Sequence, residues 1–341
     1  MLVSRSPTPW KLCAVCCRKA LCNNYGILSC DACKMFFRRV VLLNLEYKCE
    51  RTGSCFENLD MKSKTSPRCR ACRFQKCLQV GMVFRPVSRL NRTENDDVAS
   101  LIGRLLYLDT RRSNCLMNKF TRENPGLREM MERRRVHVVA QETATMSVHD
   151  WRFFVMFTTV DFLLSLDFMK SLEIEEKVPI LKSFAAKATL LFNAFRTFRA
   201  KSDKLITPGG HEIVPEELQT VCQVSLDFIC RIRSRLVAKL IQLNTSSEEF
   251  LLVTLILFCN PGVFPSNERA RDLISVQQDV YSSALFRHCL LTHQSAAPSR
   301  FTELLSLCHV INKNMEDIQN LAFIVRLNDA TECKKLFNDI I

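Results

Sequence analysis

Eight cysteines in the first quarter of the chain are spaced as the ligands of metal ions usually are. They form four pairs, with two residues between the members of each pair except the third, which has five. Two intervening residues let one backbone turn point both thiolates at a single centre, and a tetrahedral zinc ion takes four sulfur atoms at about 2.3 Å. The pattern therefore predicts two zinc ions, each held by four cysteines. The predicted ligands are Cys13, Cys16, Cys30, Cys33, Cys49, Cys55, Cys69 and Cys72.

The ligand types favour a structural role for both predicted zinc sites. No histidine precedes His137, so each site is all-thiolate and keeps no open position for a substrate. Three further cysteines lie in the same region. Cys77 falls on the apolar face of a predicted helix and is expected to be a small buried side chain, whereas Cys17 and Cys22 remain alternative ligands that the regular spacing does not require.

Cysteine usage and hydropathy argue against a secreted or membrane protein. Of the 18 cysteines, 11 lie between Cys13 and Cys77. We expect no secretion signal, because no apolar stretch with a basic start occurs in the first thirty residues. The longest apolar run, from Phe250 to Cys259, is too short to cross a bilayer. Because no apolar run is long enough to cross a bilayer, no membrane partner is expected. Cysteines in a reducing compartment bind metals more readily than they form disulfides, so zinc is the expected cofactor.

Positive charge is concentrated in the cysteine-rich segment. Residues 1–90 contain 17 Lys and Arg against 5 Asp and Glu, a net charge of +12, whereas residues 91–341 contain 31 against 30. A compact basic segment favours a polyanionic partner, above all nucleic acid. The alternative is a basic surface that only meets solvent.

The segment CDACKMFFRRVVLL, residues 30–43, should form the helix that uses this charge. Apolar residues Phe36, Phe37, Val40 and Val41 lie away from a face on which charged residues recur at helical spacing. A helix of this width fits the DNA major groove, where Lys and Arg can donate to guanine and Asp can accept from cytosine. The charged face carries Asp31, Lys34, Met35, Arg38 and Arg39, and either arginine could instead hold a phosphate.

Four basic residues could also offset the negative charge of the thiolate zinc centres. Helix N-termini that follow each second cysteine pair would add to this effect. The four residues are Lys34, Arg38, Arg70 and Arg73.

Beyond the cysteine-rich segment, which we place at residues 10–85, the pattern becomes helical. Residues 86–95 are polar, begin with Pro86 and are expected to form a hinge whose neighbouring arginines could reach the minor groove. Residues 96–341 predict an all-α domain of about ten helices. The longest predicted helices span residues 151–169, 175–199, 248–260 and about 267–288.

No catalytic constellation is apparent, so we expect that the chain is not an enzyme. The six histidines form no metal-spaced pair with a carboxylate, and the eight glycines form no phosphate-binding loop. His288 and His293, beside Cys289, are expected to be structural or exposed. A helical domain rich in Phe, Leu and Met could enclose an apolar ligand, but the same residues could fill an ordinary core.

The cysteine frame, with CDACKMFFRR and CRACRFQKCLQVGM, resembles the DNA-binding domain of the nuclear hormone receptor family, and in particular its divergent nematode branch. The resemblance implies a small two-zinc domain, mainly α with irregular loops, in which residues 50–54 form the dimer loop. It also implies that Asp31, Ala32 and Met35 discriminate between bases, with Lys34 and Arg39 as base or phosphate contacts. The expected DNA contacts are Asp31, Ala32, Lys34, Met35, Arg38, Arg39, Arg70 and Arg73.

The helical part resembles the ligand-binding domain of the same family. EEKVPILKSF is similar to the family's third-to-fifth-helix signature, LLVTLILFCNPG to its eighth helix, and PSRFTELLSL to the tenth, which usually carries dimerisation. Arg196 matches a position that often holds the polar end of a ligand. Its alternative role is to pair with a buried Glu, because an Arg on an apolar helix needs a partner.

The segment LFNDII at residues 336–341 is similar to the family's activation helix. The resemblance implies that it caps a groove and helps a short leucine-rich coregulator helix to dock, with Lys170 or Lys182 as the opposing basic clamp. The alternative is a terminal amphipathic helix packed on the core. The implied coregulator residues are Leu336, Phe337, Asp339, Ile340 and Ile341.

Together these features predict a zinc-dependent, sequence-specific transcription factor of the nuclear hormone receptor type that regulates RNA polymerase II transcription in the nucleus. Two structural zinc ions per chain would serve a DNA-binding domain, followed by an all-α ligand-binding-type domain. The expected partners are double-stranded DNA, transcriptional coregulators, a small lipophilic ligand and a second receptor chain, identical or different.

Two alternatives stay open at the level of the sequence. A zinc-scaffolded adaptor would bind another protein and not a specific DNA sequence, and it would be indifferent to duplex DNA. An enzyme with purely structural zinc ions would show turnover by residues 96–341, but no residues can be nominated for it.

Overall fold

The computed structural model describes residues 11–51, 53–56, 68–84, 94–132, 136–140, 146–202, 204–214, 217–264, 266–328 and 334–340. Two compact units divide the chain. The first comprises Met1–Arg92, Gly103–Lys119 and Ala140–Thr143, and the second Thr93–Ile102, Phe120–Val139 and Ala144–Ile341. The domain boundaries expected from the sequence stay predictions, and most of the predicted hinge lies outside the described residues.

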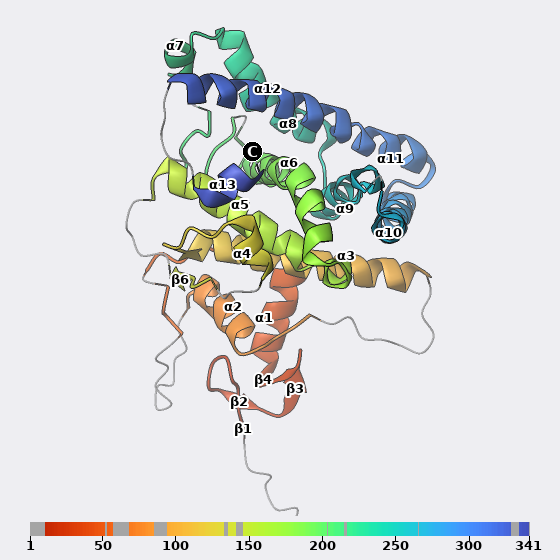
Figure 1. Ribbon diagram of the computed structural model, residues 1–341. Helices are drawn as coiled ribbons and strands as arrows, with labels where there is room; N and C mark the ends of the chain where they lie inside the picture. Colours follow the sequence, from red (N-terminus) through yellow and green to blue (C-terminus); the bar gives the residue numbers. More distant parts are fainter. Residues whose placement is uncertain are drawn as a thin grey trace, which may run out of the picture. The chain divides into compact units, whose positions relative to one another are not determined.

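The first unit contains short strands and helices that follow the cysteine pairs (red to orange in Figure 1). The turn between β3 and β4 consists of Tyr25 and Gly26, both at positive φ (56° and 92°), as a two-residue hairpin of right-handed twist requires. β1 pairs antiparallel with β2, and β3 with β4. The elements are β1 (Lys11–Leu12), β2 (Lys19–Ala20), β3 (Cys22–Asn24), β4 (Ile27–Ser29), α1 (Asp31–Leu42), α2 (Arg70–Gln79) and the second half of α3 (Glu94–Asn118).

Aromatic side chains form the core of the first unit. Phe37 of α1 and Phe74 of α2 are fully buried, and their ring centroids lie 5.9 Å apart. Tyr25 from the hairpin turn packs on Phe37 at 5.0 Å. Cys77 is also fully buried in this core, and burial raises the pKa of its thiol to about 12, which confirms its expected role as a small apolar side chain.

The second unit is built from helices (Figure 1). They include α4 (Leu127–Met131), α5 (Val148–Leu164), α6 (Ile174–Arg199), α7 (Leu218–Cys222), α8 (Leu226–Leu243), α9 (Ser247–Phe258), α10 (Glu268–His293), α11 (Ala297–Leu305), α12 (Leu307–Asn328) and α13 (Lys335–Ile340). Short 3-10 helices are η1 (Asp167–Ser171), η2 (Pro261–Val263) and η3 (Gln294–Ala296). The two short strands β5 (Lys119–Phe120) and β6 (Val139–Ala140) each have one residue in either unit. Within the described residues, none of the helices combines the length and apolarity that a bilayer crossing requires.

Local hydrogen bonds decide where these helices begin and end. Ser147 starts α5 with a capping box, since its hydroxyl accepts from the Asp150 N–H while the Asp150 carboxylate accepts from the Ser147 N–H. The structure splits the helix expected over residues 151–169 into α5 and η1. The Ser165 hydroxyl bonds the Asp161 carbonyl at 2.7 Å, and Leu166 then takes an extended conformation.

The core of the second unit lies between α5, α6 and α9. Most residues of α5 and α9 are buried, which explains their uninterrupted apolar sequences. Phe195 of α6 stacks on Phe250 of α9 with centroids 4.0 Å apart, and Phe192 meets the same ring edge-on at 5.4 Å. α12 packs on α8 and α6 (Figure 1). A cavity lies between α5, α6 and α12.

Candidate functional site

The first group of four cysteines surrounds one point at the start of α1. Its members are buried, and all four sulfur atoms lie within 4.8 Å of one another. Cys30 is the N-cap residue of α1 in an extended conformation, and Cys33 sits on the first turn, so the helix begins at the group. The Cys16 and Cys30 sulfurs are 3.6 Å apart. The group consists of Cys13, Cys16, Cys30 and Cys33.

The second group has the same form at the start of α2. Cys69 is the N-cap residue, and its sulfur accepts a hydrogen bond from the Cys72 N–H at 3.5 Å. The Cys49 sulfur lies 3.9 Å from that of Cys55, 3.7 Å from that of Cys69 and 3.4 Å from that of Cys72. Both helices therefore begin on a cysteine pair, and their N-terminal N–H groups face the thiolates.

The sulfur positions fit zinc in both groups. A tetrahedron with bonds of about 2.3 Å places its sulfurs about 3.8 Å apart, close to the separations found, whereas a disulfide needs about 2.05 Å. In the first group, the Cys13 and Cys16 side chains share a hydrogen bond. This bond lowers the pKa of Cys13 and raises the pKa of Cys16 to about 11. A cation is therefore needed to hold all four as thiolates. Cys17 and Cys22 lie outside both groups, as the spacing indicated.

Arg73 links α2 to the first group. Its Nη2 lies 3.3 Å from the Cys33 sulfur, and its guanidinium stacks 4.6 Å above the Phe36 ring. This contact places a positive charge beside the thiolates, in line with the charge offset that the sequence suggested. Arg70 is exposed and lies 5.6 Å from the Tyr47 ring. Contact of either arginine with DNA stays a prediction.

One face of α1 consists of exposed residues. Cys33, Phe37, Val40 and Val41 are buried, and Lys34 is partly exposed. Met35 is 50% exposed. The exposed side chains of the predicted DNA-reading face are Asp31, Ala32, Met35, Arg38 and Arg39. Their roles at DNA stay predictions.

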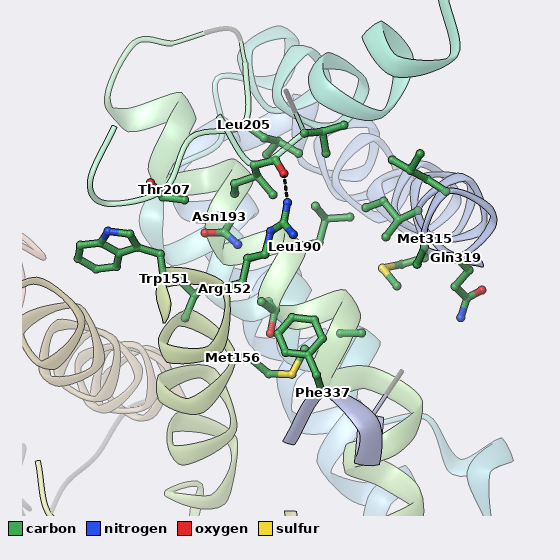
Figure 2. Close-up of a pocket in the computed structure, with 18 of the residues that line it drawn as sticks. Trp151, Arg152, Met156, Leu190, Asn193, Leu205, Thr207, Met315, Gln319 and Phe337 are labelled. Atoms are coloured by element: carbon green, nitrogen blue, oxygen red, sulfur yellow. Dashed lines mark hydrogen bonds between the residues drawn. The ribbon is translucent and has the colours of Figure 1, made fainter. Parts of the chain in front are cut away.

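A cavity of about 280 Å³ lies in the second unit (Figure 2). Apolar side chains of α5, α6, α12 and α13 line most of it, among them Met156, Leu190, Met315 and Phe337. Few polar groups face it. Arg152 donates through Nη2 to the Ile213 carbonyl at 2.7 Å, the hydrogen bond drawn in Figure 2. The cavity has the mostly apolar lining with a few placed polar groups that small-molecule sites have.

Arg196 lies next to this cavity and not in its lining. It donates to the Ile206 carbonyl, and its Nη2 donates to Asn193 Oδ1 at 3.0 Å. Asn193 itself lines the cavity. The sequence pointed to Arg196 as the ligand contact, which stays a prediction. It missed Asn193 and Arg152, although an Asn within the apolar run LLFNAF was a usable signal.

The predicted coregulator residues lie on α13. Leu336 is fully buried, Phe337 lines the cavity and Ile340 is partly exposed. Asp339 Oδ2 accepts a hydrogen bond from the Leu127 N–H at 2.7 Å, at the start of α4. A Cβ on Gly126 would lie 2.8 Å from the same oxygen, so a larger residue here would displace this carboxylate. Ile341 lies outside the described residues, and the coregulator role stays a prediction.

Two parts of this chain match models of known protein families. The family model of the double treble clef zinc finger of C4 type matches residues 11–84, and that of the ligand-binding domain of nuclear hormone receptor matches residues 139–328. In Caenorhabditis elegans, nuclear hormone receptor family member nhr-9 is 35% identical over 331 residues, 96% of each chain. Family member nhr-51 is 33% identical over 319 residues, 92% of this chain and 85% of the relative.

A solved ligand-binding domain, that of Ultraspiracle from Drosophila melanogaster, is 18% identical, with a TM-score of 0.46 over 56% of this chain and 78% of that one. The family matches confirm the resemblance, the fold class and the two-zinc cofactor expected from the sequence. They also confirm that the chain is not an enzyme, because receptors of this kind are transcription factors without catalytic activity. The chain belongs to the nuclear hormone receptor family.

Proposed function

We propose that this chain is a nuclear, sequence-specific DNA-binding transcription factor whose activity is controlled by a small lipophilic ligand. The observation that carries the proposal is the arrangement of α1. α1 begins at the first four-cysteine group, and its buried face packs on α2 in the core of the first unit. Its exposed face presents an acid, basic residues and a methionine. Such a helix can enter the major groove without rearrangement.

The chemistry of this face suits base recognition. Lys34, Arg38 or Arg39 would donate to guanine O6 and N7, and Asp31 would accept from cytosine N4. Met35, which is 50% exposed, would contact the methyl group of thymine. The basic residues around it would bind phosphates and fix the register of the helix.

Selection of bound sites from random duplex DNA by the zinc-loaded full chain tests this part of the proposal. It should be done at physiological salt, because low salt strengthens binding to any sequence. We expect a reproducible short motif, and one or two copies of it would distinguish a monomer from a dimer on DNA. Enrichment of no sequence would contradict specific DNA binding and favour a zinc-scaffolded adaptor.

Replacing Lys34 with Ala should weaken binding to the selected motif by about 1–3 kcal/mol and relax the preference at one base position. The measurement is the affinity of both proteins for every single-base variant of the motif. Lys48→Ala is the control, since it removes the same charge from an exposed position outside α1. A loss by Lys34→Ala that is equal on all variants would make Lys34 a phosphate contact.

The cavity of the second unit supports control by a ligand. Its lining suits an apolar body, and Phe337 of α13 forms part of the wall, so a bound molecule would touch the terminal helix. Because Asn193 Oδ1 accepts from Arg196, its Nδ2 is the atom that can donate to a ligand. We therefore propose an apolar ligand that carries a hydrogen-bond acceptor at one end.

Filling the cavity should block an apolar probe that carries an acceptor group. 1-Anilinonaphthalene-8-sulfonate has this form, and its fluorescence reports binding. Leu190→Trp places a larger side chain in the lining and should weaken probe binding at least about tenfold. Ile241→Trp, at a position of α8 that is 50% exposed and outside the cavity, is the control and should bind as the wild type does. Equal binding by the Leu190→Trp protein would show that the probe lies elsewhere.

The proposal also includes two protein partners, a second receptor chain and a transcriptional coregulator. Exposed apolar residues Val276, Val280 and Leu291 share a face of α10 and support contact with a second receptor chain. For coregulators, Ile340 on α13 supports docking, whereas Asp339 is engaged with α4. A coregulator helix that binds here would rely on apolar contacts more than on a carboxylate at its N-terminus.

A further inference from the structure

The second half of α3 carries polar residues that are buried inside the first unit. A long helix next to solvent normally exposes such residues, and buried polar groups require hydrogen-bond partners. The relevant side chains are at most 8% exposed, and they are Asp109, Thr110, Arg112, Ser113, Asn114 and Asn118. Five of them have partners on the zinc-binding segment, far away in the sequence, whereas Arg112 pairs with Asp109 on α3.

One set of contacts holds the end of α1. Asn44, which follows α1 in a left-handed conformation (φ 43°), is 1% exposed. Its Nδ2 donates to Asp109 Oδ2 at 2.9 Å, and its Oδ1 accepts from the Thr110 hydroxyl at 2.8 Å. Asp109 also pairs with Arg112 at 2.7 Å, so its charge is balanced within α3. A closed polar network of this kind fixes one relative position of the two helices.

A second set of contacts reaches the second cysteine group. Asn118 Oδ1 accepts a hydrogen bond from the N–H of Cys49 at 3.0 Å, and Asn118 Nδ2 donates to the Tyr47 carbonyl at 3.0 Å. The two bonds hold the backbone on both sides of residue 48. Asn114 Nδ2 donates to Gln75 Oε1 on α2 at 3.2 Å. Cys49 is the ligand whose sulfur lies near those of all three other members of its group.

Apolar contacts continue the same interface toward the start of the segment. The Tyr107 ring packs edge-on against Phe37 of α1, with centroids 6.2 Å apart. Gly103 lies so close to Phe84 that a Cβ would be 2.9 Å from its ring. The interface between α3 and the zinc-binding segment is thus close-packed near Gly103 and hydrogen-bonded near Asn118. Both kinds of contact are typical of the interior of a single domain.

From these contacts we infer that the part of α3 from Gly103 to Asn118 is a third structural helix of the zinc-binding unit and that Asn118 is a positioning residue for the second zinc site. The zinc-finger family model ends at residue 84, so it does not include this helix. Groups that orient the ligands of a metal typically change its affinity about 10- to 100-fold when they are removed. Asn118 acts in this way on Cys49, through the backbone and not through the sulfur.

Zinc release from the full-length protein tests this inference without DNA, so its failure is distinguishable from failure of the proposed function. The Asn118→Ala protein and the wild type are mixed with the colorimetric chelator 4-(2-pyridylazo)resorcinol, and the release of both zinc ions is followed. We expect one zinc ion to leave about 10- to 100-fold faster from the variant, with the other unchanged. Asn320→Ala, at an exposed position of α12, is the matched control and should release zinc as the wild type does.

Hydrogen exchange and a second variant separate a positioning role from general unfolding. The amide of Cys49 should exchange faster in Asn118→Ala, while the amides of α1 keep their protection. Gly103→Leu should lift α3 from Phe84 and also speed release of the second zinc ion. Unchanged release in both variants would overturn the inference. Equal acceleration at both zinc sites would overturn it too, since it would mean that the whole unit had loosened.

Discussion

Cys33→Ser should remove one of the two zinc ions and abolish DNA binding by the full-length protein. The serine hydroxyl does not ionise near neutral pH, so the first group keeps three thiolates and loses its closed tetrahedron. Structural zinc in small domains contributes apparent free energies of order 10 kcal/mol, far more than such a domain gains from its core. Cys33 is fully buried on the first turn of α1, so loss of the metal should free the helix that we propose to read DNA. Metal analysis and DNA affinity are the measurements.

The control for this variant is Cys22→Ser, which changes an exposed cysteine outside both groups. It should keep two zinc ions and wild-type affinity. Release of zinc by a strong chelator should reproduce the Cys33→Ser result in the wild type, and added zinc should reverse it. A Cys33→Ser protein that binds two zinc ions and the selected DNA motif would show that the first group does not hold the helix.

The zinc groups and the exposed face of α1 were predictable because their signal is local. Two residues between cysteines fix the direction of both thiolates, and the period of 3.6 residues fixes which side chains of α1 share a face. Cys30 and Cys69 illustrate this, since each begins a helix where the spacing requires one. The packed cores of α5 and α9 follow from their apolar sequences in the same way.

Contacts between distant segments were not predictable in this way. The segment DTRRSNCLMN in α3 has the composition of an exposed helix face, and only its partners Asn44, Gln75 and Cys49 explain its burial. Asp339 likewise finds the Leu127 N–H, 212 positions away. A single sequence shows which polar groups are present. It does not show which of them form hydrogen bonds with one another, because tertiary packing determines the partners.

Glu249→Gln should destabilise the second unit by about 3 kcal/mol at neutral pH. Glu249 and Arg300 form a two-pronged ion pair between α9 and α11, with distances of 2.7 and 2.6 Å, and their side chains are 2% and 11% exposed. Removing one charge leaves the other buried without compensation, which costs more than the pair itself contributes. Urea unfolding, followed by circular dichroism, measures the change. Glu268→Gln is the control, since this side chain is 83% exposed and its pair with Arg271 contributes little.

The pH dependence of this difference gives an independent check. Burial tends to raise the pKa of Glu249, but the hydrogen bonds from Arg300 and the Ser246 N–H outweigh it and hold the pKa below its usual value. A carboxyl with a lowered folded pKa stabilises the protein fully above its unfolded pKa of about 4.3, and this contribution is lost as the pH falls through the folded pKa. Asp150 and Glu176 also have lowered pKa values, so wild-type stability alone cannot isolate Glu249. The difference between wild type and Glu249→Gln should therefore stay constant from neutral pH to about pH 5 and shrink below about pH 4.3. A difference that persists at low pH would mean that the glutamine acts through lost packing and not through the lost charge.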